Sequence, residues 1–223
     1  AANMPLARLE NVEPKLRDML VETFVKRSAA FSQQGTFESA ARDLKIALRL
    51  QADGDSESLR SSLNQLQKLE AAVRLKTDAD ALFASSEFEA ADAEYEKALA
   101  EEPGLVSALS NRAALKMARG KHSDGAALCS RALDLLMADA GSIGHGEPEA
   151  HELISGAVPP PGSAVRKEWV LKTLLRRGAA FLELGDYKCS LADYRDALQL
   201  DPGNVELQND VKEIEELMNE DAC

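Results

Sequence analysis

The stretch LRRGAAFLELGDYKCSLADYRDALQL, residues 175–200, decides the fold because the chain contains a second version of it. It aligns without a gap with VKRSAAFSQQGTFESAARDLKIALRL, residues 25–50. Small and large apolar residues recur three or four positions apart on both sides of a glycine, Gly35 or Gly185. This pattern predicts two packed helices joined by a turn in which glycine supplies a left-handed backbone.

Two further copies lie between these, ALFASSEFEAADAEYEKALAEEP and SNRAALKMARGKHSDGAALCSRALDLL. An alanine closes the second helix of each, and Ala98 and Ala132 are 34 residues apart, the period of a tetratricopeptide repeat. Prolines Pro103 and Pro202 follow the second helix of two copies, where a helix must stop. The chain therefore resembles the tetratricopeptide family over most of residues 20–215.

The resemblance implies an all-α fold, a right-handed superhelical solenoid of stacked hairpins with a C-terminal capping helix. We expect an N-terminal segment, 1–15, a first hairpin plus linking helix, 16–70, and a three-repeat module, 71–223. The leucine-rich segment 56–83 has no proline or glycine and predicts one long helix. NVELQNDVKEIEELM predicts the cap. A stretch rich in glycine and proline, about 139–166, predicts an insertion loop.

Charge and composition narrow the function classes. The formal charge is −12, from 38 acidic and 26 basic side chains, which argues against a nucleic-acid or anionic-membrane partner. No apolar run approaches the roughly 20 residues of a membrane-spanning helix. The cysteines are odd in number and form no CxxC pair, which favours a reducing compartment, cytosol or nucleus, and we expect a cytoplasmic protein. They are Cys129, Cys189 and Cys223.

Patterns that would indicate catalysis are weak. His145 and His151 stand among acidic residues, but six positions apart in a glycine-containing loop fits no standard metal spacing. GSIGHG lacks the GK[ST] ending of a phosphate-binding loop. We therefore expect no metal, no cofactor and no enzyme activity.

Three-repeat modules of this kind resemble the carboxylate-clamp domains of Hsp70 and Hsp90 co-chaperones. That family's pattern is Lys and Asn one turn apart, then Asn, then Lys and Arg one turn apart. Counted from the repeat landmarks, these positions fall on Lys76, Asp80, Asn111, Lys172 and Arg176. The resemblance implies that they hold the carboxylates of the chaperone's acidic C-terminal tail.

The spacing of the last pair suits that role. Lys172 and Arg176 are four positions apart and would project from one helix face, where each charge-assisted hydrogen bond adds roughly 1.5–3 kcal/mol. Asp80 departs from the pattern, because it puts an anion where the family has a neutral donor. It either repels an anionic ligand or pairs with Lys76 or Arg176 and occupies the clamp. Both alternatives predict weakened binding of a chaperone tail.

A narrower resemblance covers roughly residues 72–220. SRALDLLM, KTLLRRGAAFLELGDYKCSLADYRDALQLDPGN and LQNDVKEIEELM are similar to the C-terminal repeats of the axonemal dynein assembly factors that carry a CS domain. This implies a co-chaperone module with client or assembly-factor proteins as further partners, cytoplasmic or associated with the cilium. The alternative is a scaffold that binds another protein, or its own kind, without chaperone contact.

Overall fold

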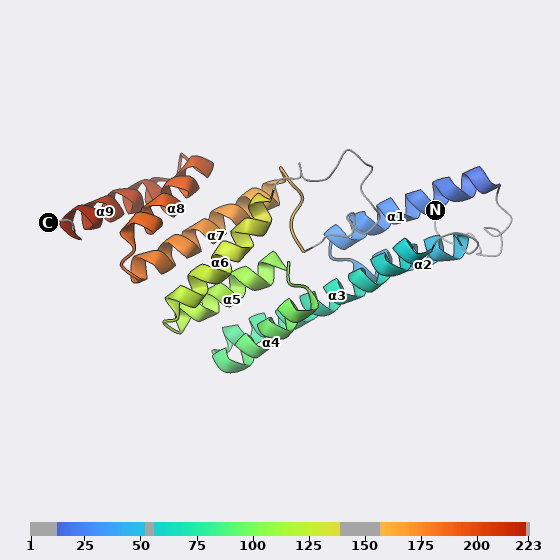
Figure 1. Cartoon of the computed structure of the whole chain (residues 1–223), viewed down its shortest axis with the longest axis horizontal. Helices are drawn as coiled ribbons and strands as arrows, with labels where there is room; N and C mark the ends of the chain where they lie inside the picture. The colour runs from blue at the N-terminus through green and yellow to red at the C-terminus, as the bar shows by residue number, and fades with distance from the viewer. Residues whose placement is uncertain (1–12, 52–55, 139–156, 222–223) are drawn as a thin grey trace. The chain divides into compact units, whose positions relative to one another are not determined.

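The computed structural model describes residues 13–51, 56–138 and 157–221, and in these ranges helices joined by turns and short loops are the regular structure, without a strand (Figure 1). The helices are α1 (Pro14–Gln33), α2 (Phe37–Leu50), α3 (Glu57–Ala84), α4 (Phe88–Glu101), α5 (Val106–Ala118), α6 (His122–Met137), α7 (Ala164–Glu183), α8 (Tyr187–Leu200) and α9 (Val205–Asp221). The described residues form two compact units, divided between residues 71 and 72.

The first unit contains the α1–α2 hairpin and the beginning of α3. Its core includes Val25, Leu44 and Leu66, which bury their side chains among the three helices. Gly35 makes the turn between α1 and α2 with φ +74°, the left-handed value expected from the sequence. Ser28 donates its hydroxyl to the carbonyl of Ala40 at 2.9 Å, so the hydroxyl is satisfied where the two helices touch.

The long helix and the capping helix predicted from the sequence are both present. α3 is one uninterrupted helix from Glu57 to Ala84. α9 packs on α8 through a small core that includes Leu191, Val211 and Ile214 (Figure 1). Burial of this apolar stripe leaves the acidic side of α9 toward solvent, as a terminal cap requires.

The insertion loop differs from its predicted bounds at its end. α7 begins at Ala164, two residues before the expected end of the loop at about residue 166, because Ser163 accepts a hydrogen bond from the backbone N–H of Arg166 at 3.1 Å and caps the helix. The first part of the loop, 139–156, lies outside the described residues, as do His145 and His151.

The second unit stacks the helices from the C-terminal part of α3 to α9. Small residues lie where paired helices touch: Ala79, Ala91 and Ala113 have no exposed surface. At Gly178 a Cβ atom would stand 2.8 Å from ring carbons of Tyr194, so only glycine fits without displacing the ring. The repeat logic of small residues inside each hairpin is therefore confirmed.

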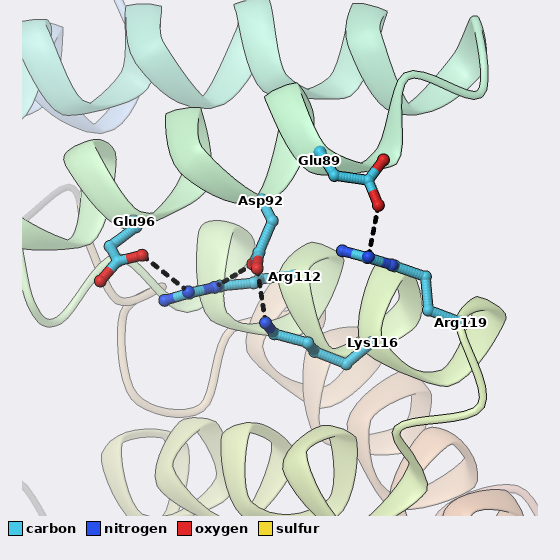
Figure 2. A network of polar contacts seen from close by, with 6 residues as sticks. All are labelled: Glu89, Asp92, Glu96, Arg112, Lys116 and Arg119. Carbon is cyan, nitrogen blue, oxygen red and sulfur yellow. Dashed lines mark hydrogen bonds and ion pairs between the residues drawn. The ribbon is translucent and has the colours of Figure 1, made fainter.

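An ion network joins α4 to α5 in this unit (Figure 2). Asp92 accepts from Arg112 at 2.7 Å and from Lys116 at 2.5 Å. Arg112 also pairs with Glu96 at 3.2 Å. A separate pair joins Arg119 to Glu89. The side chains at the centre are mostly buried, so removal of one partner would leave a charge that is largely out of water and uncompensated.

Candidate functional site

The five positions predicted from the clamp pattern come from three helices of the second unit. α3 supplies Lys76 and Asp80, α5 supplies Asn111, and α7 supplies Lys172 and Arg176. We refer to these five residues as the helix-A cluster, since each lies on the first helix of a hairpin. Hydrogen bonds link Asp80 to Lys76 and Asn111, and electrostatic effects link Lys172 to Arg176 and to the α3 pair.

One half of the cluster surrounds the Asp80 carboxylate. Lys76 pairs with its Oδ2 atom at 2.6 Å. Asn111 donates from its amide to Oδ1 at 2.9 Å, and the hydroxyl of Tyr95, on α4, donates to the same oxygen at 2.5 Å. Both carboxylate oxygens therefore have partners, which come from α3, α4 and α5.

The contacts in this half of the cluster determine the charge states of Asp80 and Tyr95. Burial alone would raise the pKa of Asp80, but the hydrogen bonds from Lys76, Tyr95 and Asn111 outweigh it and hold the pKa below its ordinary value. Burial, together with the neighbouring Asp80 charge, raises the pKa of Tyr95 well above its ordinary value. At neutral pH Asp80 is therefore an anion and Tyr95 a neutral donor.

The other half contains two cations with neutral neighbours. Arg176 donates from Nη1 to the carbonyl oxygen of Ser110 at 2.8 Å and to its hydroxyl at 2.5 Å. The ammonium of Lys172 lies 4.9 Å from the centre of the Trp169 ring, a cation–π contact. Within the described ranges neither cation forms an ion pair. The nearest acidic influence on this half is Glu168, one turn before Lys172 on α7, which acts on Lys172 without forming an ion pair with it.

The two halves influence each other. The pKa of Lys172 is lowered first by partial desolvation and then by repulsion from Arg176 and Lys76, while Glu168 and Asp80 raise it. Burial lowers the pKa of Arg176 as well. Lys172 therefore lies within electrostatic reach of both residues of the α3 pair.

The structure shows which of the two cations, Lys76 or Arg176, pairs with Asp80. Its ion pair is with Lys76, one turn earlier on the same helix, while Arg176 bonds to Ser110 instead. Tyr95 is a residue of this site that the clamp pattern in the sequence does not include. A signal was available, because a tyrosine at a buried position needs a partner for its hydroxyl.

The matching positions of the first copy do not reproduce this arrangement. Lys26 occupies the place of Arg176, and it pairs with Glu22 one turn earlier on the exposed face of α1. Because Glu22 stands where Lys172 does in the last copy, we predict that the first copy has a structural role.

Cys129 lies on α6 and shows no exposed surface. Burial raises the pKa of this thiol to about 11, so it is a thiol and not a thiolate at neutral pH. In the part of the chain that the structure describes, no group of three or more His, Cys, Asp or Glu is placed to hold a metal ion. Nor does any helix there have the length and apolar character needed to cross a membrane.

The repeated hairpins, with small residues inside and a terminal helix packed on the last one, define an α-solenoid of the tetratricopeptide type. Comparison with known proteins supports this class through structure alone. No family model matches the chain, and no curated protein matches it.

Several solved structures match it. The first tetratricopeptide domain of Spaghetti (RPAP3), solved with the HSP90 peptide SRMEEVD, is 21% identical with a TM-score of 0.50; the match covers 68% of this chain and 95% of that one. The N-terminal domain of stress-induced protein-1 from C. elegans is 21% identical with a TM-score of 0.50, covering 66% and 97%. The P58(IPK) domain, 17% identical with a TM-score of 0.58, covers 89% and 46%.

These matches confirm the predicted fold class, a tetratricopeptide solenoid. At such identities they show the fold and not the ligand. The narrower resemblance to the axonemal dynein assembly factors stays a prediction.

Proposed function

We propose that this chain is a protein-interaction module that binds an acidic peptide through the helix-A cluster, and that the peptide is the C-terminal tail of Hsp70 or Hsp90. The observation that carries the proposal is the half of the cluster that contains Lys172 and Arg176. Lys172 and Arg176 lie one turn apart on α7, without an ion pair among the described residues, in a chain with an excess of acidic side chains. The RPAP3 domain, which has the same fold, was solved with an HSP90 peptide.

The energetics favour a carboxylate at this place. Arg176 bonds to neutral oxygens of Ser110, and a ligand carboxylate would replace or supplement these with charge-assisted hydrogen bonds of roughly 1.5–3 kcal/mol each. An anion would also relieve the repulsion between Lys172 and Arg176 that lowers the pKa of Lys172. Because the attraction is electrostatic and Lys172 is exposed, we expect binding to weaken as salt is added.

The wider role is proposed from the sequence resemblance. The module would belong to a cytoplasmic co-chaperone that grips a chaperone tail and helps to assemble protein complexes such as axonemal dynein. Client or assembly-factor proteins would be its second partners. We propose no catalytic activity, and no nucleic-acid or membrane partner.

Isothermal titration calorimetry with a peptide ending in Glu-Glu-Val-Asp tests the proposal. Wild-type protein should bind it in a salt-dependent way, and the double variant Lys172→Ala/Arg176→Ala should lose binding. A matched control is Lys188→Ala/Arg195→Ala, which removes the same charge from exposed positions of α8 and should bind like wild type. Calorimetry is preferred to Trp169 fluorescence because the Lys172 change also removes the contact with that ring.

Two results would overturn the proposal. One is the absence of binding at millimolar peptide. The other is equal binding by wild type and the α7 double variant, which would place the peptide elsewhere and favour a scaffold that works without this cluster.

A further inference from the structure

The helix-A cluster contains two groups of donors that could each hold one carboxylate. Lys76, Tyr95 and Asn111 form the first group, and in this structure they already hold the carboxylate of Asp80. Lys172 and Arg176 form the second, and within the described residues their direct partners are an aromatic ring and neutral oxygens, with Glu168 acting on Lys172 without an ion pair.

We propose that this site binds one ligand carboxylate, at Lys172 and Arg176, and that Asp80 permanently takes the place of a second. The inference rests on the proposed function above and specifies which ligands that site accepts.

Asp80 is difficult to displace for three reasons. Both of its oxygens are engaged, one by Lys76 and the other by Tyr95 and Asn111. It is attached to the same helix as Lys76, one turn away, so its effective concentration at that ammonium far exceeds that of a free peptide. An incoming carboxylate would also have to approach the Asp80 charge while removing its partners.

The donors themselves are arranged for an internal anion. The hydroxyl of Tyr95 is buried, and it would lose its acceptor if Asp80 moved away. A buried donor without an acceptor is costly, so the tyrosine holds Asp80 in place even when a ligand arrives.

The consequence concerns the ligand. A peptide whose last residue is aspartate offers two neighbouring carboxylates, the main-chain terminus and the side chain. A site with two carboxylate-binding positions would need both carboxylates for full affinity, whereas a site with one such position needs only one of them. This chain should therefore accept an acidic side chain without a free C-terminus, and a free C-terminus without an acidic last residue.

A cycle of four peptides measures this directly. They end in Glu-Glu-Val-Asp as the free acid, in the same residues with a C-terminal amide, in Glu-Glu-Val-Asn as the free acid, and in Glu-Glu-Val-Asn with the amide. With wild-type protein, we expect either single change to weaken binding by no more than about threefold, and both changes together to weaken it by about tenfold or more. With Asp80→Asn, each single change should already weaken binding by about tenfold.

Several outcomes would overturn the inference. If a single change weakens binding to wild type as much as to Asp80→Asn, the wild-type site holds two carboxylates. If wild type binds none of the peptides and Asp80→Asn binds them, Asp80 closes the whole site, and the proposed function holds only for the variant. If neither protein binds the free acid, the proposed function itself fails and the inference falls with it. The wild-type cycle is decisive even if the variant does not fold.

Discussion

The guanidinium of Arg177 donates to both carboxylate oxygens of Asp193, at 2.9 and 2.7 Å. Asp193 is only 3% exposed, and its hydrogen bond raises the pKa of Arg177. Arg27 and Asp43 make the same two-point contact, at 2.6 and 2.7 Å, at the matching positions of the first copy. The pair ties the first helix of a hairpin to the second and is a repeated structural element, separate from the helix-A cluster.

Removal of this arginine should be costly. We expect Arg177→Ala to lower the free energy of unfolding by about 3 kcal/mol, because the nearly buried Asp193 carboxylate loses its counter-charge. Urea denaturation followed by circular dichroism measures this. Arg195→Ala is the matched control, since Arg195 pairs with Glu215 on the surface and its loss should cost less than about 1 kcal/mol. Equal losses in the two variants would contradict a stabilising role for the buried pair.

The network between α4 and α5 makes a second prediction. Asp92→Ala leaves Arg112 and Lys116 partly buried without their shared carboxylate (Figure 2), and we expect a loss of about 2–4 kcal/mol in the free energy of unfolding. Glu96→Ala removes a carboxylate that is 72% exposed, and it should change stability by less than about 1 kcal/mol. A similar effect of both variants in chemical denaturation would show that burial of the network adds nothing.

Asp80 gives the stability a specific dependence on pH. Its folded-state pKa lies below the unfolded value of about 3.9, so its contribution is present above that pH and is lost as the pH falls through the folded-state pKa. We expect the difference in stability between wild type and Asp80→Asn to shrink below about pH 4. Denaturation midpoints near pH 6 and pH 3 provide the measurement.

A control for the pH experiment is Glu38→Gln, because that carboxylate is 91% exposed and its replacement should change the free energy of unfolding by less than about 1 kcal/mol. If Asp80→Asn follows the wild-type profile at every pH, then the contacts of Asp80 contribute no linked stability.

Peptide affinity gives the fourth prediction. Asp80→Asn removes an anion beside the proposed ligand site, and we expect the free-acid chaperone peptide to bind more tightly by at least about 1 kcal/mol, roughly fivefold. Calorimetric titration of both proteins at the same salt concentration tests this. Unchanged or weaker binding would mean that Asp80 does not oppose the ligand.

Much of the fold could be predicted from the sequence because the repeats are recognisable in the sequence itself. The match between residues 25–50 and 175–200 fixes two hairpins, and the period between Ala98 and Ala132 fixes the others. The leucine pattern of α3 and the absence of proline and glycine determine that it continues unbroken. Each of these is a local property, which a single sequence can reveal.

The positions of the helix-A cluster could be counted from the same landmarks, but its contacts could not. Whether Asp80 pairs with Lys76 or with Arg176 depends on the distances between α3, α5 and α7. The packing of the helices sets these distances. The pairing of Asp92 with Arg112 and Lys116 crosses from one repeat to the next and follows no period. The Arg177–Asp193 contact could have been inferred, because both gapless copies keep an arginine and an aspartate at the same spacing.

Asp80 is separated from the family's asparagine by little genetic distance. Codons for these two amino acids differ only in their first base, so one transition exchanges a carboxylate for an amide that occupies nearly the same volume. If the proposed single-carboxylate site is right, this one change would separate a module that needs two carboxylates at a chain end from one that binds a single carboxylate, without rebuilding a helix. Natural variation at position 80 is therefore the first place to look for a change in the ligands that this protein binds.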